Sequence, residues 1–262
     1  MTPHFRLRPL SLLAVLLTAT SGCGKAAYEA GLARTADYYA HVNRLNENLS
    51  AKAISSGGVS VRLPLQFSPM ADDPETEPNE LQPYYLGLEL PGVVGAYRAD
   101  VNVSVGGQVE PHPAFLYVCS NGPLLAQRAD GDQSVEPLRL IEEIELQLQQ
   151  AFGVVLPPGA DGDGRDPNVR YPERLPRQAV YETSKDYTAV RFQPAEESGV
   201  FSVPMEFTLY TAQGGGDLQV AFLFLMPQEP TPDEDLQQRL TMMLETVEFT
   251  APQSGGPRPG GF

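Results

Sequence analysis

The sequence has few of the residues that carry common enzyme chemistry. Of its 262 residues only two are cysteines and three are histidines, and tryptophan is absent. It contains no Gly-x-Ser-x-Gly elbow, no His-Glu-x-x-His pair and no glycine-rich phosphate loop. The sequence therefore predicts no cofactor, and it favours a protein that is not an enzyme of the common hydrolytic classes.

Basic residues are also scarce. The chain has 18 Lys and Arg against 33 Asp and Glu, which gives a formal net charge of −15 at pH 7. Binding to a phosphate backbone relies on clustered Lys and Arg, so the sequence predicts no nucleic-acid partner. The same scarcity disfavours charge-driven binding to anionic lipid headgroups. The acidic excess is typical of a soluble, self-repelling domain.

The beginning of the chain differs in composition from the rest. It contains Arg6 and Arg8 and no acidic residue, followed by a largely apolar run over 10–19 and small residues at 20–22. Ten helical residues rise about 15 Å, half of a hydrocarbon core of roughly 30 Å, so this run is too short for a permanent membrane span. Residues 1–22 are therefore predicted to be a removable signal peptide.

The segment Thr20-Ser21-Gly22-Cys23 resembles the lipobox of bacterial lipoproteins, although Thr20 stands where that family usually has an aliphatic residue. In the family, the thiol is alkylated with diacylglycerol before cleavage. The resemblance implies that Cys23 becomes an acylated N-terminus, with fatty acids such as palmitate, on a tether over 23–26. It also implies a place in the cell envelope, facing the periplasm or the exterior. The alternative is an ordinary signal peptide cut nearby.

The remaining cysteine has no partner in the mature chain, because Cys23 would be acylated. Cys119 has His112 and Asn121 close in sequence, but it shares the apolar face of an expected strand, which predicts a small buried hydrophobic residue. His41 lies among the polar positions of an expected helix, and His112 stands between two prolines. Both histidines are expected at the surface.

Hydrophobic periodicity predicts helices and strands in alternating groups. Helices are expected over 27–50, 134–152 and 231–244, and strands over roughly 59–67, 84–90, 94–105, 114–119, 178–183, 187–193, 200–210, 217–226 and 246–250. Residues 71–83 are expected to form a solvated loop, and 252–262 a disordered tail.

Three local signals refine this assignment. Pro64 cannot donate to a ladder, so the strand over 59–67 is expected at a sheet edge. Ser134 is expected to cap its helix, with Pro137 in the first turn, and Thr231-Pro232-Asp233-Glu234 reads as a capping box. The unpatterned stretch 156–177 is expected to be either an interlobe linker or a surface loop.

The grouping of these elements predicts the fold class. Strands grouped together with helices between them indicate an α+β fold, in which helices pack on the faces of an antiparallel sheet. The expected domain is 27–251. A strand-strand-helix order occurs around 94–152 and again around 200–244, which leaves open two similar lobes, 27–155 and 178–251, or a coincidence.

Two stretches of this domain resemble PsbP-like α/β-sandwich domains. One is the closing stretch, a helix with Leu240 and Leu244 followed by Thr246-Val247-Glu248-Phe249, and the other is Gly58 to Pro64. The resemblance covers about a fifth of the chain. It implies a non-catalytic accessory or docking role and carries no functional residues across.

Carboxylates offer two further candidates. Asp161, Asp163 and Asp166 could hold calcium, but Asp166 and Pro172 stand where a calcium loop needs Gly and Glu, which favours a solvated acidic turn. The adjacent pairs Glu142 with Glu143 and Glu196 with Glu197 diverge on their elements and indicate exposed faces.

The sequence therefore favours a lipid-anchored, non-enzymatic envelope protein that meets the membrane through its N-terminal anchor and docks an envelope protein or a small ligand. Two alternatives stay open. One is an unfamiliar enzyme that uses carboxylates and tyrosines, and the other is calcium-dependent adhesion through residues 161–166.

Overall fold

The computed structural model describes residues 9–70, 90–129, 139–157, 168–178, 180–194 and 203–250, with side chains from Lys25 onward apart from that of Asp233. The chain divides into two compact units, residues 1–47 and 48–262, which are treated separately. Several expected features lie outside the described residues: the strand over 84–89, Ser134 with Pro137, Asp161 to Asp166, Glu196 with Glu197, and the tail 252–262.

The described residues of the first unit all belong to one long helix. Helix α1 spans Pro9–Asn48 without a break, so it includes both the expected helix and the segment 23–26 that was expected to be a tether. Its exposed apolar side chains include Tyr28, Leu32 and Tyr39. No helix in the described part of the chain is long and apolar enough to cross a membrane.

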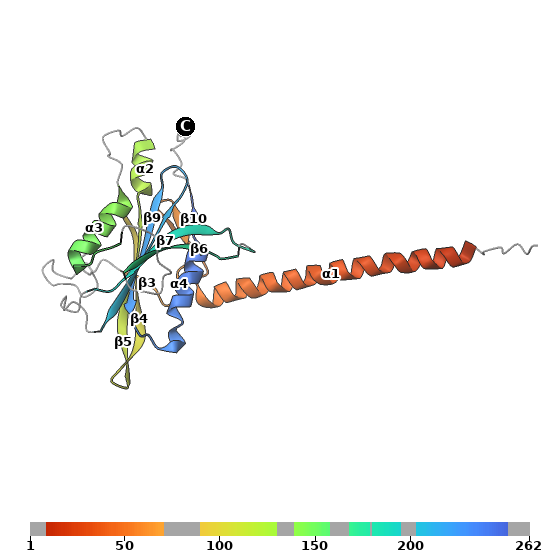
Figure 1. Ribbon diagram of the computed structural model, residues 1–262, viewed down its shortest axis with the longest axis horizontal. Helices are drawn as coiled ribbons and strands as arrows, with labels where there is room; N and C mark the ends of the chain where they lie inside the picture. The colour runs from red at the N-terminus through yellow and green to blue at the C-terminus, as the bar shows by residue number, and fades with distance from the viewer. Residues whose placement is uncertain are drawn as a thin grey trace, which may run out of the picture. The chain divides into compact units, whose positions relative to one another are not determined.

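The second unit is built on a seven-stranded antiparallel sheet (Figure 1). The order is β3-β4-β5-β9-β8-β7-β6. The strands are β3 (Ser68–Pro69), β4 (Val93–Val105), β5 (Gln108–Ser120), β6 (Val169–Leu175), β7 (Lys185–Phe192), β8 (Met205–Gln213) and β9 (Gln219–Pro227). The central strand β9 is buried along nearly its whole length, as its almost continuous apolar sequence predicts.

The helices of this unit are α2 (Gly122–Ala129), α3 (Leu140–Phe152) and α4 (Leu236–Glu245). A short 3-10 turn, η2 (Pro232–Glu234), precedes α4. A second sheet has the order β1-β2-β10, formed by β1 (Ile54–Ser56), β2 (Val59–Val61) and β10 (Glu248–Phe249). The fold is therefore α+β, as predicted, with helices packed on an antiparallel sheet.

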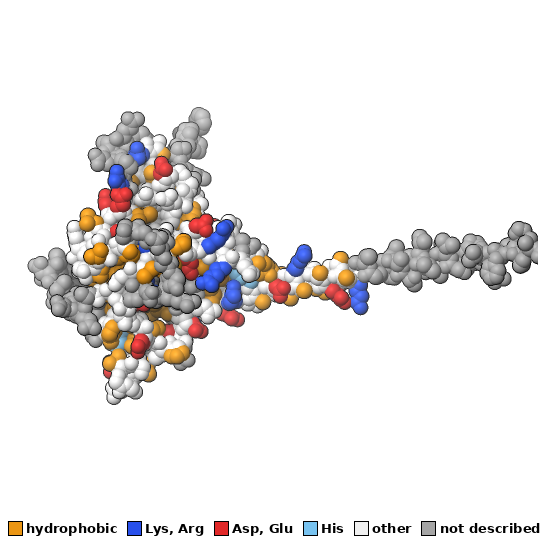
Figure 2. All heavy atoms as spheres, in the orientation of Figure 1, with side chains coloured by type: hydrophobic (Ala, Val, Ile, Leu, Met, Phe, Trp, Pro, Cys, Tyr) orange, Lys and Arg blue, Asp and Glu red, His pale blue; other side chains and the backbone are white. Residues whose placement is uncertain are grey.

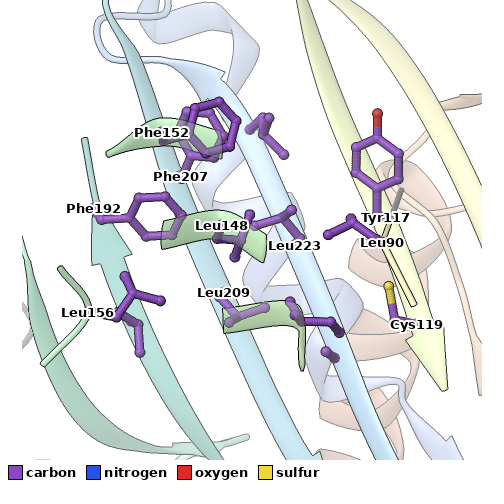
Figure 3. Packing of buried hydrophobic residues seen from close by; sticks show 14 of the residues in the cluster. Leu90, Tyr117, Cys119, Leu148, Phe152, Leu156, Phe192, Phe207, Leu209 and Leu223 are labelled. Carbon is purple, nitrogen blue, oxygen red and sulfur yellow. The ribbon is translucent and has the colours of Figure 1, made fainter. Parts of the chain in front are cut away.

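Helix α3 covers one face of the large sheet. It buries Leu140, Ile144, Leu148 and Phe152, which recur every four residues and so share one side of the helix. Figure 3 shows Phe152 against Phe207 of β8, with ring centroids 4.5 Å apart. Gly153 ends the helix in the left-handed conformation, φ 65°, as its glycine predicts. Complete burial of side chains of this size stabilises the fold by about 1.5–3 kcal/mol each.

Helix α4 covers the opposite face, and Figure 1 shows α3 and α4 on either side of the sheet. Tyr187 of β7 points to that side, where its hydroxyl donates a 2.8 Å hydrogen bond to the carbonyl oxygen of Leu244. The expected buried positions of α4, Leu236, Leu240 and Met243, are all buried.

The two possible lobes share one sheet. Strand β5 pairs with β9, for example Phe115 with Leu225, which joins the N-terminal and C-terminal groups of strands. A two-fold axis relating two such antiparallel hairpins would be perpendicular to the sheet and would keep both following helices on one face. Because α3 and α4 lie on opposite faces, the two strand-strand-helix stretches do not have the symmetry of a repeat.

Four local predictions are wrong in this unit, and the first two concern the surroundings of β2 and β6. Strand β2 ends at Val61 and is the middle strand of its sheet, so the expected edge position is wrong. Beyond it the chain leaves that sheet, and Pro64 pairs with Leu49 in an isolated bridge. The expected loop over 156–177 contains β6, which pairs with β7 at the sheet edge.

The other two concern the segment 178–183 and the start of α4. The described residues of 178–183 form bends and coil instead of a strand. Thr231 makes no side-chain capping bond. Glu234 accepts a 3.0 Å hydrogen bond from the backbone N–H of Asn102, so the two residues do not form the expected capping box. This interaction ties η2 to β4 instead.

Candidate functional site

A pocket of about 300 Å³ lies beside α2, at one end of the large sheet. One wall comes from α2 and from Arg139 just before α3, and the other comes from the turn between β8 and β9. The lining residues are Asn121, Leu124, Leu125, Arg128, Arg139, Gln213, Gly214, Asp217, Leu218 and Gln219.

Asn121 joins the two walls of this pocket. Its side chain is 5% exposed, and its amide Nδ2 donates a 3.1 Å hydrogen bond to the carbonyl oxygen of Asp217. Its Oδ1 accepts a 2.8 Å hydrogen bond from the backbone N–H of Gln219. Its own carbonyl oxygen accepts from the N–H of Leu125 in the first turn of α2. One buried amide thus fixes the β8–β9 turn relative to α2.

The start of α2 is fixed by a second close contact. The hydroxyl of Ser120 donates to the carbonyl oxygen of Gly57 and accepts a 3.0 Å hydrogen bond from the N–H of Gly122. A Cβ at Gly122 would lie 2.0 Å from the Gly57 oxygen, which only a glycine at this position avoids. Because both ends of the contact are backbone, the wall formed by α2 cannot shift without moving the 57–58 turn.

The charged groups of the pocket are divided between its walls. Arg128 and Arg139 stand on the helical wall, and Asp217 stands on the turn. Arg139 also forms a 3.3 Å ion pair with Glu142, but the side chains are 78% and 70% exposed, so solvent screens that pair. Figure 2 shows basic side chains near α2 and the start of α3, with acidic side chains beside them.

One polar atom of the lining lacks a partner. Among the described residues, Oε1 of Gln219 is buried and accepts no hydrogen bond. A buried acceptor without a donor is costly and calls for a group that can donate to it. Leu124 and Leu125 add apolar surface from α2, and Leu218 adds it from the turn.

This arrangement can bind, and its described lining offers little for bond making. It includes two guanidinium groups, one carboxylate and side-chain amides, but no Ser, Cys, His or Tyr that could act as a nucleophile or a base. Guanidinium groups bind carboxylates and phosphates through paired N–H donors.

Asn121 lines this pocket, and the other expected site residues are not among its lining residues. Cys23 falls within α1, and its side chain is outside the described part. Cys119 is 1% exposed in the α3-side core, as predicted, and burial raises the pKa of its thiol to about 12. Strand alternation puts His112 on the other face of β5, so it cannot reach Cys119.

Both histidines are half-buried, so they keep part of their surface exposed, and the expected surface position is met in part. His112 lies opposite Val101 in the β4–β5 ladder. His41 Nδ1 lies 3.2 Å from a guanidinium nitrogen of Arg44, one turn along α1. These neighbours are structural, and neither histidine lines the pocket.

Carboxylates do not gather into a metal site in the described residues. Glu142 and Glu143 are both exposed on α3, as expected. Burial raises the pKa of Glu206 on β8, while the nearby Arg191 guanidinium, 3.3 Å away, lowers it. This half-buried ion pair joins β7 to β8.

Asn121 is the link that sequence reasoning missed. The sequence presents it only as a neighbour of Cys119, and no local pattern predicts α2. The usable signal was a polar residue followed by Gly and Pro, directly after an apolar strand, which is typical of a sharp turn. Its partners Asp217 and Gln219 could not be found locally, because they are nearly a hundred residues away.

Comparison with known proteins gives no relative on which to base an identity: no protein-family model matches the chain, and no curated protein matches it.

Proposed function

We propose that this chain is a lipid-anchored, non-enzymatic protein of the cell envelope whose α+β domain binds a small ligand in the pocket beside α2. The anchor rests on the lipobox-like segment that ends at Cys23. Two acyl chains, at about 0.8 kcal/mol per buried CH₂, hold a protein far more firmly than one myristoyl chain does. The resemblance to PsbP-like domains implies the same kind of accessory role.

The observation that carries the binding function is the construction of the pocket. Its walls are joined by Asn121, and its described lining combines arginines and leucines without a nucleophile-base pair. A pocket with fixed walls loses little conformational entropy when a ligand enters. These features support recognition of a ligand that leaves unchanged.

The anchor is tested by labelling the full-length chain with a palmitate analogue in a bacterial host. We expect wild type to incorporate the label and Cys23→Ser to lose it. Cys119→Ala is the matched control, because it removes the other cysteine, which is buried, and it should label like wild type. Equal labelling of wild type and Cys23→Ser would refute the anchor.

The non-enzymatic role is tested by incubating the protein with any molecule that binds the pocket and analysing that molecule by mass spectrometry. We expect it to be recovered intact. Conversion to a product that depends on Arg128 or Asp217 would favour the alternative, an enzyme that uses carboxylates.

A further inference from the structure

We propose that the pocket beside α2 recognises a small aliphatic zwitterion, a molecule that carries a carboxylate and an ammonium group on a short branched chain, as an aliphatic amino acid does. This inference rests on the proposed binding function and specifies its ligand.

The division of charge between the walls supports a ligand with two opposite charges. Arg128 and Arg139 on the helical wall can donate to a carboxylate. On the facing wall, the Asp217 carboxylate can accept from an ammonium group. An ammonium group has only donors, so it suits a wall that presents a carboxylate.

The net charge of the protein favours a zwitterion over a simple anion. A chain with a formal net charge of −15 repels anions at long range. A zwitterion carries no net charge, so it can approach without that repulsion and still present its carboxylate to the arginines.

The size and apolar lining set the rest of the ligand. A volume of about 300 Å³ is at the lower end of the range for small-molecule pockets. The side chains of Leu124 and Leu125 are half-buried on α2, so they offer a surface on which an aliphatic group can shed water. A ligand about the size of leucine is therefore the natural probe.

The test uses isothermal titration calorimetry on the full-length protein in detergent, with three probes that share an isobutyl group. Leucine carries both charges, 4-methylpentanoate lacks the ammonium group, and 3-methylbutylamine lacks the carboxylate. We expect leucine to bind at least about tenfold more tightly than either of the other two, because each loses one set of charge-assisted hydrogen bonds.

Two pocket variants should act on different probes. Arg128→Gln should weaken leucine and 4-methylpentanoate by about tenfold and leave 3-methylbutylamine unchanged. Asp217→Asn should weaken leucine and 3-methylbutylamine and leave 4-methylpentanoate unchanged. Asp217 has φ +64°, a conformation that asparagine also adopts readily, so this variant should keep its fold. Arg174→Gln is the control, since Arg174 is an exposed, acid-paired arginine on β6.

Leucine binding no tighter than 3-methylbutylamine would overturn the inference. Affinities that neither pocket variant changes would also overturn it, as would the absence of binding by any probe at concentrations up to about 10 mM. If 4-methylpentanoate alone binds, and Arg128→Gln abolishes it, the zwitterion is wrong while the proposed ligand-binding function stands. Conversion of a bound probe would instead refute the proposed function.

Discussion

Replacing Asn121 with alanine removes the two side-chain hydrogen bonds that join the β8–β9 turn to α2. The amide Nδ2 no longer donates to the carbonyl oxygen of Asp217, and Oδ1 no longer accepts from the N–H of Gln219. The two backbone bonds of residue 121, to Gln219 and from Leu125, are retained because they do not depend on the side chain.

The expected loss follows from these contacts. Each hydrogen bond contributes about 1 kcal/mol net, so two account for about 2 kcal/mol. The N–H of Gln219 also loses its acceptor, at a position where the replaced side chain was 5% exposed. Where water cannot reach it, an unpaired donor costs about 1–3 kcal/mol. We therefore expect Asn121→Ala to lower the free energy of unfolding by about 2 kcal/mol if water reaches the freed N–H and by up to about 5 kcal/mol if it does not.

Urea denaturation followed by circular dichroism measures this change through the transition midpoint. Asn102→Ala is the matched control, because Asn102 is exposed on β4 and only its backbone is used by Glu234. Its effect should stay within about 0.5 kcal/mol. If Asn121→Ala were as mild as this control, the amide would not be what joins the pocket walls.

Three further variants or conditions test the fold. Gly122→Ala places a Cβ 2.0 Å from the Gly57 carbonyl oxygen and should cost at least about 2 kcal/mol of unfolding free energy, measured in urea. Tyr187→Phe removes the hydrogen bond to Leu244 without leaving a cavity and should cost about 1 kcal/mol by the same measurement. Raising the pH should destabilise the fold through Cys119, whose pKa rises from 9.0 to about 12 on folding. Below pH 9 the thiol is protonated in both states, whereas between pH 9 and 12 only the unfolded state ionises, which removes about 1.4 kcal/mol per pH unit.

Each of these three has a control. Gly215→Ala should be nearly neutral, because a Cβ there meets nothing within 4 Å. Tyr28→Phe should also be neutral, since Tyr28 is 67% exposed on α1. In Cys119→Ala, the free energy of unfolding should fall less steeply above pH 9 than it does in wild type. The assigned contacts would be contradicted if the unfolding free energies of wild type and Cys119→Ala fell equally with pH. They would also be contradicted if Gly122→Ala and Gly215→Ala lost equal amounts of unfolding free energy.

The elements that sequence predicted best are those buried on a simple pattern. Strand β9 is almost continuously apolar because both of its faces are covered, and α4 shows its stripe of Leu236, Leu240 and Met243 because one side packs on the sheet. In such elements the local pattern and the tertiary packing agree, so the sequence alone suffices.

Proline misled the prediction in one place and could have helped in another. Pro64 predicts an edge strand, but it lies beyond the end of β2. Pro172 lies within β6, which is a true edge strand, and there the polar sequence concealed the strand. Pro111 and Pro113 fall in the part of β5 that pairs only with β4. The rule holds at each of these strands, yet applying it requires the strand order.

The pocket could not be predicted because it depends on a long-range pairing. Asn121 meets Asp217 and Gln219 only when β5 has paired with β9. The failed capping box has the same origin, since Glu234 accepts from the N–H of Asn102, 132 residues away in the chain, instead of bonding within its own turn. Local motifs state what a side chain could do, and tertiary contacts decide which partner it has.

The pairing of Ser120 with Val220 also has a consequence for how the chain is made. During synthesis, β5 emerges about a hundred residues before β9, the strand that will flank it. The backbone N–H and C=O groups on that edge of β5 therefore stay unpaired, beside its apolar side chains, for that whole interval. Contacts so distant in sequence slow the search for the native state, to milliseconds or longer. A product truncated before β9 would keep that edge exposed, and we expect it to aggregate where the complete chain does not.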